Sequence, residues 1–428
     1  MSETAAPAPE AALRRNRDFM LLTTGQLISR IGSAITTFVM PLIALAVTHS
    51  IIRAGLVGTA TSFATVATTI PSGQIVDRRD RKLLLVIFCG FGAVLFLIAA
   101  LLAGTGGLDL LVLIVIGILA GFTTTFIAIT ETAAIRPMVS TSQFGNATAV
   151  RLARRSAAGI IGPPLGGLLL TVGLAAPFTA DGISYAVALA AAVALRTDLK
   201  PSKRPRRGFW RDVSDGMTWI WRYPAIRAIL ANAALINFAL AGIQLVLILS
   251  LRSRGYPAAE IGLIYTASGA SGLAGVLLSP AALKRFPTGS LVILISWLLV
   301  VLAVLLCIRF SLPPLLVLLA AVVFLIPTVN AGVIGYQQAA TPNDFQGRVS
   351  AASQFSIGCA VPLGPLIGSF VLERYGSVVA FLVFSVVIAA AAASLTVSRH
   401  IRTIPPPSRW ASHLAPDTDT TRVSAEAD

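Results

Sequence analysis

Twelve stretches of this chain are long and apolar enough to cross a membrane as helices. A spanning helix needs about 20 mostly apolar residues, because about 30 Å of hydrocarbon is crossed at 1.5 Å per residue. Only 12% of the residues are charged, about half the roughly 25% of an average globular protein. We therefore exclude a soluble enzyme and predict an all-α integral membrane protein with twelve transmembrane helices. The stretches lie at 20–48, 54–76, 83–103, 110–132, 153–175, 178–196, 226–251, 259–281, 289–309, 314–337, 350–372 and 376–397.

The basic residues are unevenly distributed between these stretches. If the N-terminus is cytoplasmic, 27 of the 33 Lys and Arg residues fall in cytoplasmic segments or at the cytoplasmic ends of stretches, five fall on the outer side, and Arg30 alone lies inside a stretch away from its ends. Lys and Arg accumulate on the cytoplasmic side of membrane proteins. We therefore expect a multi-pass protein of the cell membrane with both termini in the cytoplasm. The same bias accounts for the net charge of +15 without nucleic-acid binding.

The longest interior hydrophilic segment divides the stretches into six and six. Two six-helix halves with a substrate site near the membrane midplane are typical of secondary transporters. The sequence contains no GxxxxGK[ST] phosphate-binding loop, so an ion gradient would supply the energy. We predict a cytoplasmic tail over 1–17, a six-helix bundle over 18–196, a cytoplasmic linker with an amphipathic helix over 197–225, a second six-helix bundle over 226–397 and a disordered cytoplasmic tail over 398–428.

A charged motif follows the second stretch and comprises Gly73, Asp77, Arg78 and Arg81. Its pattern resembles the G-x-x-x-D-R-x-x-R-[KR] loop of the major facilitator superfamily. The resemblance, which covers roughly residues 17–400, implies the major facilitator fold of two pseudo-symmetric six-helix bundles. It also implies that these four residues belong to a cytoplasmic gate. Gly73 would allow close helix approach there, and Asp77 could pair with Arg81.

Three further segments extend the resemblance. Residues 25–32 and 214–227 are similar to the branch that contains siderophore and macrolide exporters, of the transmembrane secretion effector type. Gly162, Pro163, Gly166 and Gly167 resemble the antiporter signature of drug-exporting facilitators. Proline bends a helix and small residues let backbones approach, so we interpret this segment as a helix-bending antiporter-like motif. Ordinary tight helix packing is the alternative.

Polar side chains inside the stretches are our candidates for the substrate and ion pathway, because lipid offers them no partners. Glu131 could neutralise Arg30 if their helices adjoin. The branch often has Asp where Ser33 stands, which weakens any proton-coupling role at that position. Arg30 could instead be a structural cation bonded to backbone carbonyls, and Glu131 could be an anchor at the inner leaflet. The polar residues of the second half could simply form hydrogen bonds between neighbouring helices. The candidates are Gln26, Arg30, Ser33 and Thr37, which recur on one helical face, and Glu131, Asn232, Asn237, Gln244 and Asn330.

These observations predict a secondary active transporter that exports a hydrophobic or amphipathic small molecule, such as a drug, siderophore or secondary metabolite, by proton-coupled alternating access. An importer or facilitator of a small metabolite is a second hypothesis. A non-transporting sensor or assembly partner on a transporter scaffold is a third. We expect the substrate, membrane lipid and a proton gradient as partners of a monomer. We expect no cofactor, no metal, no catalytic site and no nucleic-acid partner.

Overall fold

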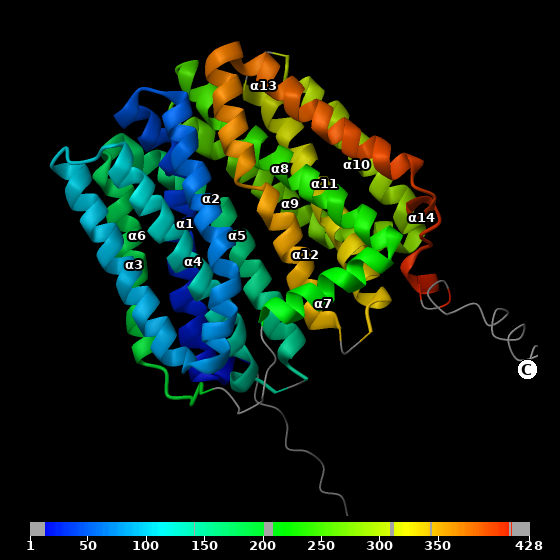
Figure 1. Cartoon of the computed structure of the whole chain (residues 1–428). Helices are drawn as coiled ribbons and strands as arrows, with labels where there is room; N and C mark the ends of the chain where they lie inside the picture. The colour runs from blue at the N-terminus through cyan, green and yellow to red at the C-terminus, as the bar shows by residue number, and fades with distance from the viewer. Residues whose placement is uncertain are drawn as a thin grey trace, which may run out of the picture. The chain divides into compact units, whose positions relative to one another are not determined.

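The computed structural model consists of helices joined by short connections (Figure 1). It describes residues 13–140, 142–200, 209–308, 312–342, 345–410 and 412, and these ranges contain no strand. The ends of both expected tails and residues 201–208 of the expected linker lie outside them. The α-helices are α1 (Arg17–Thr48), α2 (Ile51–Arg78), α3 (Arg81–Gly104), α4 (Leu110–Met138), α5 (Phe144–Val172), α6 (Ala175–Val193), α7 (Phe209–Arg222), α8 (Pro224–Ser253), α9 (Ala258–Arg285), α10 (Thr288–Leu305), α11 (Leu312–Ala340), α12 (Gln346–Ala360), α13 (Leu363–Val397) and α14 (Arg399–Arg402).

Ten helical stretches in the described ranges are long and apolar enough to cross a membrane. Helix α5 is not among these ten, because its three arginines, which lie in its first half, make it less apolar. Residues 346–397 form one of the ten stretches. Gly376, with a φ of 84°, interrupts the helix within α13 and divides this stretch into two passes. With α5 added and the last stretch divided at Gly376, the predicted all-α fold of twelve membrane passes is confirmed.

The fifth pass begins earlier than the sequence predicts. We expect a start at residue 153, whereas α5 begins at Phe144. The prediction began the stretch after Arg151 and treated Arg154 and Arg155 as its flank, because charged side chains are excluded from lipid. In the structure α5 continues through them, and Arg154 is buried against protein.

The chain forms two compact units. The first contains residues 1–206 and 247–266, and the second contains residues 207–246 and 267–428. In the first unit, α1 packs on α2, α5 and α6, α2 packs on α4, and α3 packs on α4 and α6. In the second unit, α10 packs on α11 and α13, and α7 packs on α12.

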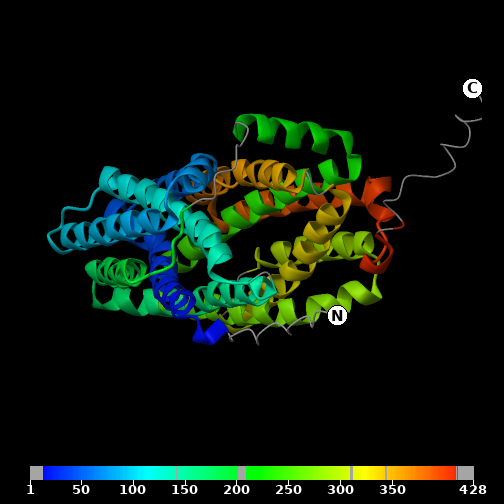
Figure 2. The same cartoon turned by 90° about the horizontal axis from the view of Figure 1, so that it is seen from below.

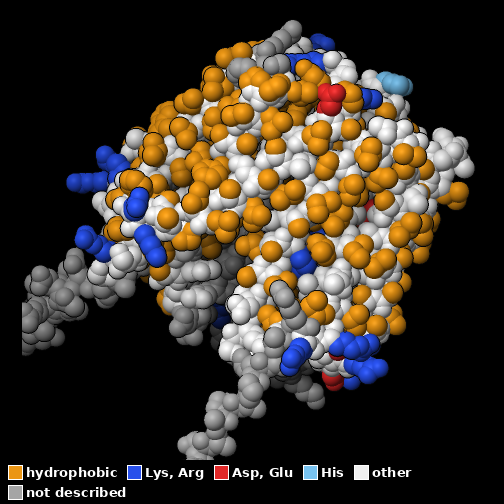
Figure 3. Space-filling model, turned by 180° about the vertical axis from the view of Figure 1, so that it is seen from behind, with side chains coloured by type: hydrophobic (Ala, Val, Ile, Leu, Met, Phe, Trp, Pro, Cys, Tyr) orange, Lys and Arg blue, Asp and Glu red, His pale blue; other side chains and the backbone are white. Residues whose placement is uncertain are grey.

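Large apolar side chains cover much of the surface. Leu101, Val172 and Leu277 are 67%, 78% and 74% exposed. Figure 3 shows hydrophobic side chains over most of one face, with Lys and Arg near its margins. An apolar surface of this extent would drive aggregation in water, whereas hydrocarbon solvates it. The protein is therefore a multi-pass membrane protein.

Helix α7 is held on α12, and Figures 1 and 2 show the two lying against each other. A Cβ added to Gly216 would lie 2.4 Å from the carbonyl oxygen of Arg348, so only glycine allows this approach. The Arg348 guanidinium is 3.3 Å from the Asp215 carboxylate. Trp219 and Ile220 are buried in a cluster that includes residues of α12. Trp219 and Ile220 of α7 are therefore covered by protein, whereas Trp221 is 62% exposed.

Residues 398–410 are folded, although the sequence analysis assigned them to a disordered tail. Ile401 and Ile404 are at most 2% exposed. The backbone amide of Gly289 in α10 donates to the Ile404 carbonyl at 3.2 Å. The Trp410 ring packs edge-on against Tyr336 of α11. The expectation failed because these apolar residues, isolated in a polar sequence, find burial partners only in the tertiary structure.

Close packing of α8 on α13 predicts a stability effect. A Cβ at Gly242 would lie 2.0 Å from Cζ of the buried Phe384 ring. We expect Gly242→Ala to lower the free energy of unfolding by about 1–3 kcal/mol, as overpacked cores do, and to lower the melting temperature in detergent. Gly159→Ala is the matched control, because nothing lies within 4 Å of its Cβ position. Equal melting temperatures for both variants would contradict the packing.

Candidate functional site

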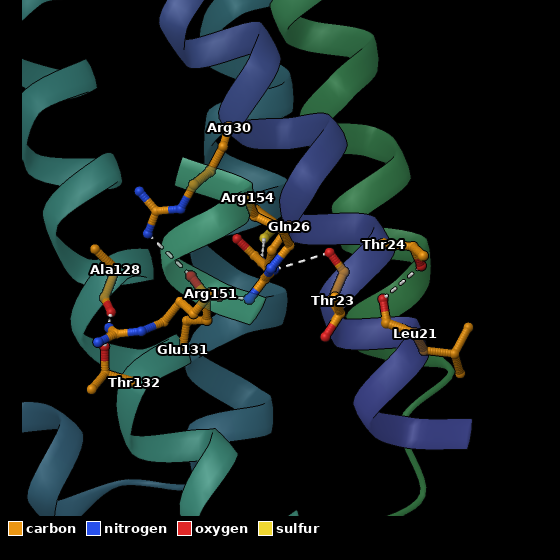
Figure 4. A network of polar contacts seen from close by, with 11 residues as sticks. Leu21, Thr23, Thr24, Gln26, Arg30, Ala128, Glu131, Thr132, Arg151 and Arg154 are labelled. Atoms are coloured by element: carbon orange, nitrogen blue, oxygen red, sulfur yellow. Dashed lines mark hydrogen bonds and ion pairs between the residues drawn. The ribbon is translucent and has the colours of Figure 1, made fainter. Parts of the chain in front are cut away.

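A buried ion network joins three helices of the first unit (Figure 4). Glu131 of α4 is completely buried. Its Oε2 accepts from Nη2 of Arg30 on α1 at 3.1 Å, and its Oε1 accepts from Nη2 of Arg154 on α5 at 2.6 Å. The structure thus contains the Arg30–Glu131 pair considered from the sequence, and it adds Arg154 as a second partner.

Helix geometry explains why these residues meet. Glu131 lies seven residues before the end of α4, and Arg154 lies ten residues after the start of α5. At 1.5 Å per residue these positions are about 10 and 15 Å from the α4–α5 connection, so the two side chains come to similar depths. Nη1 of Arg154 also donates to the Thr23 carbonyl of α1 at 2.9 Å. Arg154 therefore fixes the position of α1 as well.

The two arginines differ in exposure. The side chain of Arg154 is 6% exposed, whereas that of Arg30 is 29% exposed. Removing one member of a buried ion pair is costly because the other charge is left without a partner. Arg154 is therefore the structural partner of Glu131, and Arg30 is the partner that can reach water or a ligand.

The other predicted side chains of α1 have separate contacts. Gln26 is buried, and its Nε2 donates to Sγ of Cys89 on α3 at 3.8 Å. The hydroxyl groups of Ser33 and Tyr185 of α6 lie 3.0 Å apart and share a hydrogen bond. Thr37 is exposed, and its hydroxyl donates to the Ser33 carbonyl at 2.7 Å. The polar face of α1 is thus divided among contacts with α3, α4 and α6.

A second buried carboxylate lies where α1 meets α6. Asp181 accepts from the Thr36 hydroxyl at 2.7 Å and from the Ser184 hydroxyl at 3.1 Å. It is completely buried. A Cβ at Gly32 would lie 2.5 Å from Oδ1 of Asp181. These contacts hold α6 close to the middle of α1.

The predicted polar residues of the second unit lie on α8 and α11. Asn232 is 5% exposed, and its Nδ2 has no hydrogen-bond partner among the described residues. Asn237 is exposed and donates to the Ala233 carbonyl at 2.8 Å. Gln244, also exposed, shares the α8 face of Asn237 because it lies seven residues further on. Asn330 is exposed on α11.

A cavity of about 400 Å³ lies between the end of α11 and the start of α12. Its walls are rich in amide and hydroxyl groups and include Gln337, whose Nε2 donates to the Ser353 hydroxyl at 2.6 Å. Sequence analysis did not select this cavity. The described residues contain no group of three or more His, Cys, Asp or Glu that could hold a metal ion.

The charged motif lies at the α2–α3 connection. Asp77 and Arg78 are exposed in the last turn of α2, and Arg81 is the first residue of α3. The cap of α3 is Asp80, whose side chain accepts from the Lys82 amide at 2.8 Å.

The close helix approach expected at Gly73 is not present in this conformation. No described atom beyond its own helix and chain neighbours lies within 4 Å of a Cβ added there. This face of α2 is therefore open, and a larger side chain would meet no steric obstacle in the state that the structure represents.

The antiporter-like motif of α5 is in close contact with two other helices. Cβ atoms added at Gly162 and Gly166 would lie 2.4 and 2.9 Å from side-chain atoms of α1, and one added at Gly167 would lie 2.4 Å from the Ala258 carbonyl at the start of α9. Reciprocally, a Cβ at Gly262 of α9 would lie 2.5 Å from the Pro163 carbonyl. Small residues on both helices thus let the backbones touch.

Comparison with known proteins decides the family. The model of the Major Facilitator Superfamily matches residues 22–291 and 230–424. The chain belongs to this superfamily. As a member of the major facilitator superfamily, it is a secondary transporter. No protein with a curated description matches the sequence significantly.

Solved transporters share the major facilitator fold with this chain. A bacterial homolog of the human lysosomal transporter Spinster, inward-facing and unoccupied, has a TM-score of 0.72 at 14% identity, covering 91% of this chain and 98% of its own. The nucleoside transporter NupG has a TM-score of 0.72 at 13% identity, covering 89% and 98%. An inward-facing bacterial homologue of the iron transporter ferroportin has a TM-score of 0.68 at 16% identity, covering 90% and 100%. At these identities the likeness concerns the fold alone.

Sequence reasoning missed Arg154 as a buried residue. It placed Arg151, Arg154 and Arg155 in a cytoplasmic segment, because cations near the end of an apolar stretch usually lie outside the membrane. The available signal was the spacing of Arg151 and Arg154, which is three residues and therefore places both on one helical face. Nothing in the sequence indicated a role for Tyr185, because its hydrogen bond depends on the position of Ser33 in another helix.

The ion network predicts a stability effect. Arg154→Ala leaves the buried Glu131 with one partner, so we expect a loss of about 3–5 kcal/mol in the free energy of unfolding. Melting temperature in detergent would measure it. Arg136→Ala is the matched control, because Arg136 is exposed in the last turn of α4 and should change stability by less than about 0.5 kcal/mol. A variant of Arg154 as stable as the control would show that the network is not structural.

Proposed function

We propose that the protein is a proton-coupled exporter of hydrophobic or amphipathic small molecules that works by alternating access. The ion network carries this proposal, since it places a buried carboxylate between arginines of two other helices. Ionisable groups within membrane helices mark ion and substrate pathways. We further propose that the protein lies in the cell membrane with both termini cytoplasmic, on the basis of its Lys and Arg distribution, and that it acts as a monomer.

The network offers a means of coupling protons to substrate movement. A proton that neutralised Glu131 would remove its attraction for Arg30, the more exposed partner. Arg154 would remain anchored to the Thr23 carbonyl, so α1 and α5 would stay together. The position of Arg30 would then depend on whether Glu131 carries a proton, and Arg30 would report that state to the substrate pathway.

The antiporter-like motif supports export. It resembles the signature of drug-exporting facilitators, and its glycines bring α5 into backbone contact with α1 and with the start of α9. We propose that this packing closes the outer end in one conformation and separates during transport. The charged motif at the α2–α3 connection would close the inner end in the opposite conformation, when Gly73 would meet another helix.

The resemblance to siderophore and macrolide exporters supports an amphipathic cargo. The structural neighbours include transporters described for nucleosides, for iron and for lysosomes, so the fold itself does not select a substrate. Uptake of a metabolite is the competing hypothesis, and the direction of proton-coupled flux distinguishes the two.

Proton coupling predicts substrate-induced proton movement in inside-out vesicles. With an imposed proton gradient and a pH-sensitive dye, we expect one class among siderophores, macrolides, lipophilic cations and lipophilic anions to release protons from wild-type vesicles. Glu131→Gln and Arg30→Gln should abolish that release because neither retains the exchangeable pair. Arg136→Gln, inserted to the same level, should behave as wild type. Wild-type transport in both network variants, unaffected by collapse of the pH gradient, would exclude this mechanism.

The gate proposal predicts that Gly73→Val separates folding from transport. The melting temperature should match that of the wild type, because the Cβ position at Gly73 is open. Transport should fall severely, because the added methyl groups would block closure of the inner end. Export at the wild-type rate by Gly73→Val would remove Gly73 from the gate.

A further inference from the structure

Four arginines gather around one carboxylate in the first unit. Arg151, Arg154 and Arg155 lie within two turns of α5, and Arg30 approaches them from α1. Arg154 and Arg155 each interact electrostatically with both Arg30 and Arg151. Glu131 is the acidic side chain in this cluster, and it pairs with Arg30 and Arg154 (Figure 4). Four positive charges and one negative charge leave the cluster with a formal charge of +3.

Protein contacts leave part of this cluster without a partner. Glu131 and the Thr23 carbonyl occupy both terminal nitrogens of Arg154, but its Nε is buried without a hydrogen bond in the described chain. Arg151 donates to the Thr132 hydroxyl, a neutral group. Arg155 is exposed and forms no hydrogen bond or ion pair with any described residue, although it lies close enough to Arg30 and Arg151 for their charges to act on it. One arginine would be enough to neutralise Glu131 in a purely structural network. The cluster contains four arginines, which is three more than that.

Grouping four arginines with one carboxylate is costly. Arg154 lies ten residues into α5, about 15 Å from the start of that helix. Cations at such positions are rare, and they either pair with an acidic side chain or line a water-filled pathway. Mutual repulsion adds to the cost, because the arginines are close enough to interact. An anionic ligand would lower both the cost of holding these cations among the helices and the repulsion between them.

We propose that the cluster binds the anionic head group of the transported molecule, so that the substrate is an amphipathic carboxylate or phosphate. Guanidinium groups bind such oxyanions with paired, charge-assisted hydrogen bonds. Arg155 and the half-buried Arg30 supply the available donors, and Arg154, fixed by Glu131 and Thr23, positions the cluster. This inference rests on the proposed function, whose substrate class it narrows from hydrophobic or amphipathic molecules to amphipathic anions.

Equilibrium binding tests the inference independently of transport. The intact protein in phosphatidylcholine nanodiscs would be titrated by calorimetry with four probes that share one ring system. Two are anions, 1-naphthyl phosphate and 2-naphthoate; 2-naphthol is neutral and 1-naphthylmethylammonium is a cation. We expect binding of the anions alone. Arg155→Gln should weaken it about tenfold or more, the loss that follows from removing a charge-assisted hydrogen bond, whereas Arg136→Gln should leave it unchanged.

Several outcomes would overturn the inference. They are binding of the neutral or cationic probe as tight as that of the anions, no binding of either anion, or equal anion affinity in wild type and Arg155→Gln. A further arm uses nanodiscs that contain phosphatidylglycerol. Loss of anion binding there would assign the cluster to lipid head groups and reject the substrate role. Anion binding without substrate-induced proton release would support this inference while rejecting proton coupling, so the two failures are distinguishable.

Discussion

The pairing of Glu131 with arginines from two other helices organises the first unit. In hydrocarbon no water stabilises a buried carboxylate, so its position is set by the side chains that neutralise it. Arg154 supplies one charge and also binds the backbone of α1, while Arg30 supplies the other from a more exposed position. The relative placement of α1, α4 and α5 therefore depends on one acidic side chain.

Small residues make that arrangement possible. Arginine and glutamate side chains reach each other only where the backbones lie close, and α5 approaches α1 at Gly162 and Gly166 with no space for a Cβ. Gly32 has the same part in the α1–α6 contact beside Asp181. Charge pairing and close packing thus act together in this unit. Glycines bring the helices close to one another, and buried polar groups fix how the helices are aligned.

The same helices carry more positive charge than the carboxylate can balance. This excess connects fold to function, because a membrane protein that retains uncompensated cations among its helices needs a reason to bear their cost. The proposed binding of an anion supplies such a reason for Arg155 and for Arg30, whose partner Glu131 is shared with Arg154. If the arginine cluster were neutralised only by bound substrate, the loaded and empty transporter would differ in charge. That difference would be a physical reason for the two states to favour different conformations.

The sequence by itself determined the helical membrane fold, because twenty-residue apolar stretches have no stable alternative to helices in lipid. It also identified Arg30 and Glu131, since ionisable groups are conspicuous in apolar stretches. It could not assign Arg154, which by sequence alone belongs to a cytoplasmic flank, nor the folding of residues 398–410 on α10 and α11. Apolar content is a local property, whereas the partner of a charge depends on which helices adjoin, and only the tertiary structure decides that.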